Sequence, residues 1–446
     1  MPAVWPRLLV IAWIALGGTI ARAEALTMDR AVAIALERNR DVIAAKLEID
    51  AAALDVVAAR VYPNPTLQYQ IGDLVLGSSN PQNAGSGAPP VHAGFWDQPV
   101  QSVGVSDVVD IWAKRAARIR AADGDVQHRR LLTEDALREI VYAVRSAFAD
   151  VVREQSEDHL AHEVADRYAA TIRISQARFK AGDISEAELR KIELEGLKYQ
   201  NDVIDADSEL DLARGKLAAL LSLRSARELP GDGLKEADQR VTFDLATLTA
   251  QALDKRPDLR AAGAARTVAE AEISAARREA LPDITLGASY THSDFQISGD
   301  NPNTLGFSIS LPLPIFDRNQ ANIGRARLDL RRAENDGERL RIAVATEVAE
   351  AVRRGTRAVT LLAVFERAPG GAVPGTATAT TDRGGMIGRA ETALQVAEKS
   401  YRAGALSLLE LLEAQRTYLD TRAQYLHALH DFQQAIIDVK HAAGES

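Results

Sequence analysis

Hydrophobic and polar residues follow two different periods along this chain. Over long stretches, apolar residues recur every three or four positions, which is the spacing of a helix that buries one face. Between these stretches lie short runs in which apolar and polar residues alternate, as they do in a half-buried strand. The four alternating runs lie at about 65–73, 101–109, 283–291 and 304–312. The pattern therefore predicts long helices interrupted by two pairs of strands.

The first helix is predicted over 27–61. Thr27 or Asp29 can cap its start, and Pro63 and Pro65 follow its end. Proline lacks the backbone N–H that a helix interior needs, so the helix should stop before these two residues.

A far longer helix is predicted over 113–180. Gly124 is almost the only residue there that disfavours a helix. The helix would have roughly 65 residues and a length of about 100 Å at 1.5 Å per residue. Its narrow apolar seam indicates coiled-coil packing against a second helix. Ala181-Gly182-Asp183 would reverse the chain, and Ser185 would cap a returning helix that ends near Leu221.

The same unit occurs twice in the chain. Residues 26–67 match 243–284 at a constant offset of 217 without a gap, and the turn at 179–185 is echoed at 401–407. Such a repeat indicates a pseudo-symmetric molecule. We divide the chain into a signal peptide over 1–23, a first repeat over 24–240 and a second repeat over 241–446. Each repeat holds a helix, two of the strands and a helical hairpin, the hairpins lying at about 113–222 and about 317–443.

One stretch breaks the symmetry between the repeats. Residues 366–389 are rich in Gly, Ala, Thr and Pro and carry no apolar seam. The offset between the repeats is 204 at Ile111/Ile315 and 222 at Gly182/Gly404, so 222 − 204 gives 18 extra residues. We interpret the stretch as a tolerated irregular insertion. A purposeful loop is the alternative, but its residues indicate no chemistry.

The amino terminus predicts export. Arg7 precedes the apolar run Leu8–Ile20, and Ala21-Arg22-Ala23 is a cleavage site of the kind found in secretory signal peptides. Cleavage would remove Arg7 and Arg22 and change the net charge from −9 to −11. An acidic chain is a poor ligand for phosphates, so we expect no nucleic-acid partner. The absence of cysteine excludes disulfides, thiolate metal sites and thiol catalysis.

The four strands indicate how many copies of the chain a membrane barrel would need. Their apolar faces carry Leu, Ile, Val, Phe and Tyr, and their other faces carry small or hydroxylic residues. Unpaired strand edges cannot lie in lipid, and membrane barrels need about eight strands or more. Three chains of four strands would together supply twelve. The alternative is two hairpins packed on a soluble core.

These features together resemble the TolC-like outer membrane efflux proteins. The marks are the duplicated unit, the Arg-x4-Pro endings at Pro65 and Pro282, and the two Gly-x-x-Ser tips. The segment Leu311–Gln320, which reads LPLPIFDRNQ, is most similar to the branch that serves heavy-metal cation efflux, of the cobalt–zinc–cadmium and nickel–cobalt types. The resemblance covers nearly all of the predicted mature chain.

The resemblance implies a membrane β-barrel joined to a long α-helical coiled-coil barrel, formed by a homotrimer with four strands per chain. It implies no enzymatic activity and no cofactor. The trimer would sit in outer membrane lipid and reach into the periplasm, where it would meet a periplasmic adaptor and a proton-driven inner-membrane pump of the resistance–nodulation–division type. The exported substrates would be divalent cations of cobalt, nickel, zinc or cadmium. The alternatives are a duct for drugs or organic compounds, a duct for type I protein secretion, and a periplasmic adaptor.

The resemblance also implies a gate after the second tip. Family acidic residues narrow the periplasmic entrance at the positions of Glu410 and Glu413, whose spacing of three puts them on one helix face. A trimer would form rings of carboxylates that attract cations. The alternative is two solvated glutamates. Tyr401 matches a tyrosine that helps to latch the closed gate, but Leu406 stands where the family has a basic partner.

The two hairpin tips are the predicted contacts for the adaptor. They are Gly182 with Ser185 and Gly404 with Ser407. Glycine permits close backbone approach, and the serine hydroxyls can donate hydrogen bonds. Simple N-capping by each serine is the alternative and is compatible with contact.

Two histidine pairs have the spacing of metal ligands. His159 and His162, and His427 and His430, each place two imidazoles on one helix face, and such pairs can bind zinc, nickel or cobalt. Neither pair has a third ligand nearby in sequence, so we interpret these histidines as solvated or as part of a seam, and we predict no metal site. No nucleophile motif, phosphate-binding loop or dinucleotide fingerprint is present.

Overall fold

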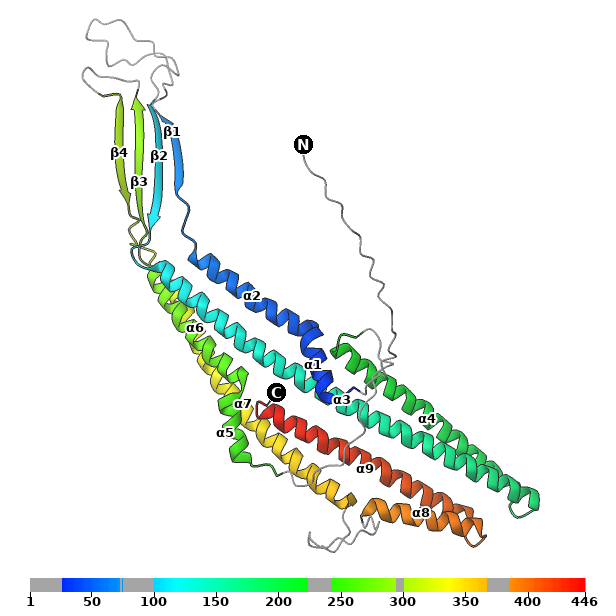
Figure 1. Cartoon of the computed structure of the whole chain (residues 1–446). Coiled ribbons are helices and arrows are strands. Elements are labelled where there is room, and N and C mark those ends of the chain that lie inside the picture. Colours follow the sequence, from blue (N-terminus) through cyan, green and yellow to red (C-terminus); the bar gives the residue numbers. More distant parts are fainter. Residues whose placement is uncertain are drawn as a thin grey trace, which may run out of the picture. The chain divides into compact units, whose positions relative to one another are not determined.

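The computed structural model describes residues 26–72, 74, 100–223, 242–293, 301–366 and 385–445 (Figure 1). The predicted signal peptide at 1–23 lies outside the described residues. By its contacts the chain divides into two compact units. Unit 1 is Met1–Ile34 with Ala147–Glu236, and unit 2 is Ala35–Ser146 with Ala237–Ser446.

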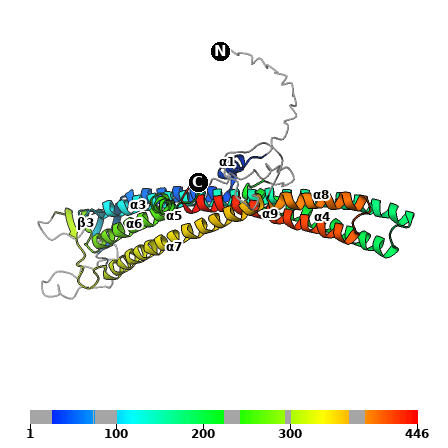
Figure 2. The ribbon, with the colours of Figure 1, turned by 90° about the horizontal axis from the view of Figure 1, so that it is seen from below.

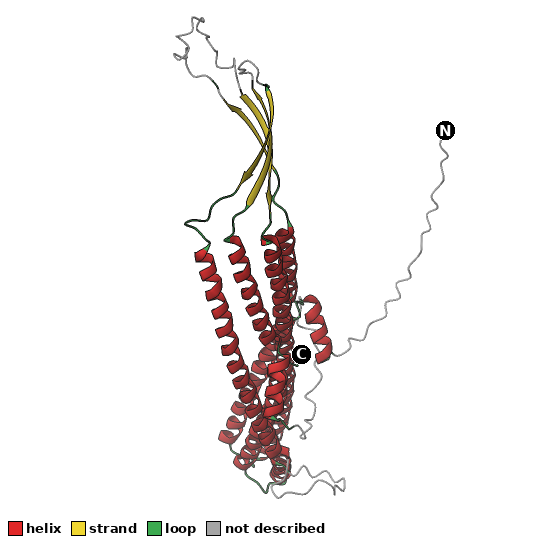
Figure 3. Ribbon diagram, turned by 90° about the vertical axis from the view of Figure 1, so that its left-hand side faces the viewer, coloured by secondary structure: helices red, strands yellow, loops and turns green. Residues whose placement is uncertain are grey.

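Unit 2 contains one antiparallel four-stranded sheet, drawn in yellow in Figure 3, and its strands follow the order β1-β2-β3-β4 (Figure 1). The strands occupy the four alternating runs of the sequence. Pairing of β2 with β3 joins the two repeats in one sheet. Within the described residues, β1 pairs only with β2 and β4 only with β3, so one edge of each remains unpaired. The bounds are β1 Thr66–Gly72, β2 Val100–Val109, β3 Ile284–Ser293 and β4 Asn303–Ser310.

The two faces of this sheet differ in chemistry. The register aligns apolar side chains in rows across all four strands, one of which is Tyr69, Val103, Tyr290 and Leu305. These side chains are exposed, and Phe307 in the next row is 81% exposed. The opposite face carries small and polar rows, one of which is Gln68, Gly104, Ser289 and Gly306. On this face the Thr291 hydroxyl donates to Ser102 Oγ at 3.2 Å. One side of the sheet is therefore apolar and uncovered by the described residues, and the other is small and hydrophilic.

The predicted single helix over 27–61 is wrong at Asn39. The structure has two helices there, α1 Met28–Arg38 and α2 Arg40–Arg60. Asn39 has extended backbone angles, and its side chain accepts hydrogen bonds from the N–H groups of Asp41 at 2.8 Å and Val42 at 3.3 Å. This N-cap stabilises a new helix start.

The second repeat breaks at the equivalent position. At the offset of 217, Asn39 corresponds to Arg256, which separates α5 Leu245–Lys255 from α6 Pro257–Glu279. Pro257 at the first helical position takes the role that the Asn39 side chain has in the first repeat, because it needs no hydrogen-bond acceptor there. Both repeats thus start with a short helix, a break and a longer helix.

The longest helix, α3, runs unbroken over 68 residues. It belongs to unit 2 up to Ser146 and to unit 1 from Ala147 onward. In unit 1 it is followed by α4, and in unit 2 α8 and α9 pack side by side (Figure 2). The bounds are α3 Lys114–Ala181, α4 Glu186–Leu220, α7 Gln320–Glu366, α8 Met386–Arg402 and α9 Leu408–Ala442. None of the helices in the described ranges is long and apolar enough to cross a membrane.

The insertion predicted at 366–389 is only partly described. Residues 386–389 are not irregular but form the first turn of α8, whereas 367–384 lie outside the described residues. Gly385 lies directly against the carbonyl oxygen of Phe365, so that a Cβ atom there would clash with it. The end of α7 and the start of α8 therefore meet at the point where the repeats lose their register.

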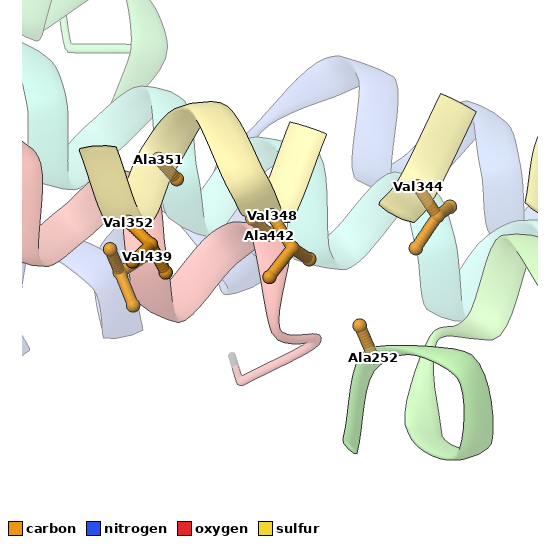
Figure 4. Close-up of a cluster of buried hydrophobic side chains, with 7 residues drawn as sticks. All are labelled: Ala252, Val344, Val348, Ala351, Val352, Val439 and Ala442. Carbon is orange, nitrogen blue, oxygen red and sulfur yellow. The ribbon is translucent and has the colours of Figure 1, made fainter. Parts of the chain in front are cut away.

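One buried cluster of unit 2 is built from small aliphatic side chains. Figure 4 shows the cluster at which α5, α7 and α9 meet. Small side chains let helix axes approach closely, and burial of each valine stabilises the fold by roughly 1.5–3 kcal/mol. The cluster consists of Ala252, Val344, Val348, Ala351, Val352, Val439 and Ala442.

An ion network lies beside this cluster. Arg256 is buried, and its guanidinium donates to Glu347 Oε2 at 2.7 Å and to Asp258 Oδ2 at 2.8 Å. A hydrogen bond from His441, together with Arg256, lowers the pKa of Glu347 to about 2. Burial alone would lower the pKa of His441, but its hydrogen bonds to Glu139 and Glu347 outweigh that effect and raise it. The network thus ties the α5–α6 break to α3, α7 and α9.

Candidate functional site: the hairpin tips

The tip of the second repeat is a tight turn between α8 and α9. Gly404 has a φ of 72°, a conformation that side chains with a Cβ atom rarely adopt. Its N–H donates to the Tyr401 carbonyl at 3.0 Å, and the Ala405 N–H donates to the Ser400 carbonyl at 2.9 Å. These two bonds satisfy carbonyls that the end of α8 would otherwise leave unpaired.

Ser407 begins the next helix with a capping box. Its hydroxyl oxygen accepts a hydrogen bond from the Glu410 N–H at 3.4 Å. In return, Glu410 Oε2 accepts from the Ser407 N–H at 2.9 Å and from the Ser407 hydroxyl at 2.6 Å. The Ser407 hydroxyl and N–H lower the pKa of the Glu410 carboxyl and keep it ionised. The carboxylate of Glu410 therefore has a local structural role at this tip.

The first repeat builds its tip in the same way. Gly182 has a φ of 83°, and Ser185 caps α4 in a capping box with Glu188. Glu188 Oε2 accepts from the Ser185 N–H at 2.9 Å and from its hydroxyl at 3.1 Å. At the tip offset of 222, Glu188 corresponds to Glu410. The acidic residue at this position is therefore a feature of both repeats.

The repeats differ one helical turn later. Glu413 in α9 stands where the first repeat has Lys191 in α4, and both residues are exposed. Glu410 and Glu413 thus lie at one tip, as the sequence predicts, but only Glu413 has a charge that distinguishes the second repeat from the first.

Tyr401 lies at the end of α8 and is 3% exposed. Its counterpart in the first repeat, Phe179, is exposed. The predicted latch residue, at the end of the helix α8 that packs against α9, is therefore buried. Sequence reasoning could not find this burial, because it depends on how the two helices pack.

Both tips have open space around their glycines. No heavy atom outside the local backbone lies within 4 Å of a Cβ atom built at Gly182 or Gly404. Ser185 and Ser407 are exposed as well. The four predicted docking residues therefore lie on accessible surface within their own units.

One histidine of the two pairs lies beside carboxylates that the sequence analysis did not single out. His162 on α3 lies near Asp158 on the same helix and Asp207 on α4, and this group leaves out His159. Asp207 was missed because it lies 45 residues from His162 along the chain (207 − 162), and only the return of α4 along α3 brings it close.

Comparison with known proteins assigns most of the chain to one family. The sequence profile of the family described as "Outer membrane efflux protein" matches residues 31–222, 248–358 and 386–445. The chain belongs to this family. It is accordingly an outer membrane efflux channel protein and not an enzyme. The unmatched gap at 359–385 contains most of the insertion at 366–389.

Relatives in this family have different names and cargoes. The chain is 25% identical over 419 residues to the cobalt-zinc-cadmium resistance protein CzcC of Cupriavidus metallidurans, covering 94% of this chain and 90% of the relative. It is 24% identical over 408 residues to the pyoverdine export outer membrane protein OpmQ of Pseudomonas putida, covering 89% and 81%. The cation efflux system protein CusC of Escherichia coli K12 is 28% identical over 233 residues, which cover 51% of this chain and 47% of CusC.

Solved channel structures show the same fold. A crystal structure of CusC matches with a TM-score of 0.71 at 20% identity and covers 94% of this chain and 92% of its own. The outer membrane protein VceC of Vibrio cholerae matches with a TM-score of 0.68 at 18% identity and covers 94% and 96%. The predicted TolC-like channel fold is confirmed by these similarities.

The positive φ at the second tip leads to a testable contrast between two glycines. Gly404→Ala should destabilise the protein by about 1–2 kcal/mol, because alanine is strained in the left-handed conformation. Gly337→Ala, in the interior of α7 and with no atom near its built Cβ, should stabilise it by roughly 1 kcal/mol, because alanine favours a helix. Thermal unfolding followed by circular dichroism in detergent measures both. If both variants shifted the unfolding midpoint in the same direction, the left-handed conformation of Gly404 would be refuted.

Proposed function

We propose that this protein is the outer membrane channel subunit of a tripartite resistance–nodulation–division efflux system. It would export divalent heavy-metal cations, such as cobalt, nickel, zinc or cadmium, across the periplasm and the outer membrane. The observation that carries the channel part of the proposal is the exposed apolar face of the β1–β4 sheet. Soluble proteins rarely leave such a face uncovered, whereas the lipid-facing side of a membrane barrel needs one.

The sheet edges support assembly as a homotrimer. The edges of β1 and β4 that are unpaired within the described residues have backbone groups without partners. In lipid these groups must be paired, and the simplest partner for the edge of β4 is β1 of another copy. Four strands fall short of the about eight that the smallest membrane barrels use, whereas three copies supply twelve. The small, hydroxylic face would then line the water-filled interior.

The hairpins would extend this channel into the periplasm. We propose that the tips at Gly182 with Ser185 and at Gly404 with Ser407 contact a periplasmic adaptor, which in turn joins an inner-membrane proton-driven pump. Their exposure and the open space around both glycines support this assignment. The segment over 1–23 would direct export and then be removed.

The names of the relatives support the choice of exported substrate. CzcC, whose name specifies cobalt, zinc and cadmium, matches over nearly the full length of both chains, and CusC is named for cation efflux. The second candidate is a duct for organic compounds, since OpmQ also matches over most of its length and its name specifies pyoverdine export. Both candidates share the same channel.

Planar-bilayer recording tests the channel. The full chain, purified in detergent, should have the mass of three copies and should form conducting pores after reconstitution. We expect stable single-channel steps, because a closed barrel with a hydrophilic lumen gives a continuous water path. A preparation that stays monomeric by light scattering and gives no conductance would contradict the proposal.

The gate can be tested in the same recordings. We propose that Glu410 and Glu413 form carboxylate rings at the periplasmic entrance and that Tyr401 helps to latch the closed gate. Glu410→Gln combined with Glu413→Gln should move the reversal potential in a salt gradient towards zero, because cation preference falls with the ring charge. Glu188→Gln is the matched control, since it removes the equivalent capping carboxylate but no proposed gate charge. Unchanged selectivity in the double variant, or an equal change in the control, would contradict the gate.

A further inference from the structure

Three potential metal ligands meet on the hairpin of unit 1. Asp158 and His162 are four residues apart on α3, so they project from one face of the helix on successive turns. Asp207 on the returning helix α4 completes the group. One ligand atom from each residue lies within 4.8 Å of the others. Side chains from both arms of the hairpin thus converge on one point.

The imidazole of His162 lies too far from either carboxylate for a hydrogen bond. Nε2 of His162 lies 3.6 Å from Asp158 Oδ1 and 3.8 Å from Asp207 Oδ1. Ligand atoms about 2.0–2.1 Å from a tetrahedral zinc ion lie roughly 3.3–3.4 Å from one another. Each contact therefore has to shorten by only a few tenths of an ångström for an ion to fit between the atoms.

The Oδ1 atom of Asp158 supports the presence of a ligand. This oxygen is buried and has no hydrogen-bond donor among the described residues. A buried oxygen without a donor loses the hydration that it has in the unfolded chain, and such atoms are rare in native proteins. A cation between Asp158 and His162 would supply the missing partner.

The charges at this point also favour a cation. Burial raises the pKa of the Asp158 carboxyl, and the hydrogen bond and negative charge of Asp207 raise it further. Arg214 and His162 act in the opposite direction but do not reverse the effect. Two carboxylates that face each other need a proton or a cation between them. Two carboxylates and a neutral imidazole together balance the charge of a divalent ion.

We propose that Asp158, His162 and Asp207 bind one divalent transition-metal cation of the zinc type, which joins α3 to α4. A mixed set of imidazole and carboxylate ligands suits such ions, whereas magnesium and calcium take oxygen ligands only. The side chains of His162 and Asp207 are 53% and 61% exposed, so the ion can enter from solvent and water can complete its coordination. The site is independent of the exported cargo, and it would bind its ion equally in a channel for organic compounds.

Titration of the full chain with zinc tests the site. The protein should be purified in detergent without a histidine tag, stripped with a chelator and titrated with ZnCl₂ in a calorimeter. The wild type should bind one ion per chain at this site. His162→Gln and Asp207→Asn should each weaken the affinity for zinc by roughly tenfold or more. Mutation of residues that only orient a metal ligand already lowers metal affinity by about 10–100-fold.

His159→Gln is the matched control. It changes the same residue type on the same helix, three positions away, and His159 is not in the ligand group. Its affinity for zinc should equal that of the wild type. Titration with Co²⁺ adds a second readout, since ligation by His162 should give visible absorption bands that His162→Gln lacks. Equal zinc binding in the wild type and His162→Gln, or an equal loss in His159→Gln, would overturn the proposal without affecting the conductance test of the channel.

Discussion

Backbone N–H and C=O groups find no water to bind inside a lipid bilayer, so each unpaired group there costs on the order of several kcal/mol. The sheet of this protein has an exposed apolar face and, within the described residues, two unpaired edges. The apolar face is suited to contact with lipid. The unpaired edges are not, unless several copies of the chain pair edge to edge and close a barrel. The opposite face, on which Gly104, Ser289 and Gly306 form one row, would then line the interior. The helices α3 and α7, which follow β2 and β4, would then belong to the same assembly.

The internal repeat shows which features belong to the fold and which do not. Both repeats break their first helix at equivalent positions, Asn39 and Arg256, although one uses an asparagine cap and the other a proline. Both repeats also share the positive-φ glycine and the capping box at the tip. A feature found in both repeats is best explained by local structure. The contrast between Glu413 and Lys191 at the tips supports the proposed gate, to which we propose that Glu410 contributes in addition to its cap.

The sequence predicts the strands well, because alternation is a local signal that needs no partner. It fails at Asn39, since the apolar spacing continues across the break and hides the change in backbone direction. The capping role of Glu410 can be read from the pattern Ser-x-x-Glu. The proximity of Asp207 to His162 and the burial of Tyr401 cannot be read from sequence at all, because both depend on the packing of two helices against each other.

Contact between the apolar face of the sheet and lipid can be measured on β4. The chain has no cysteine, so Leu305→Cys and Thr304→Cys each accept a single spin label without background. These neighbours point to opposite faces of the strand. In reconstituted protein, the label at Leu305 should collide with oxygen dissolved in lipid, and the label at Thr304 should collide with a water-soluble nickel complex. Equal access of the nickel complex to both labels would show that the Leu305 face of β4 does not lie against lipid.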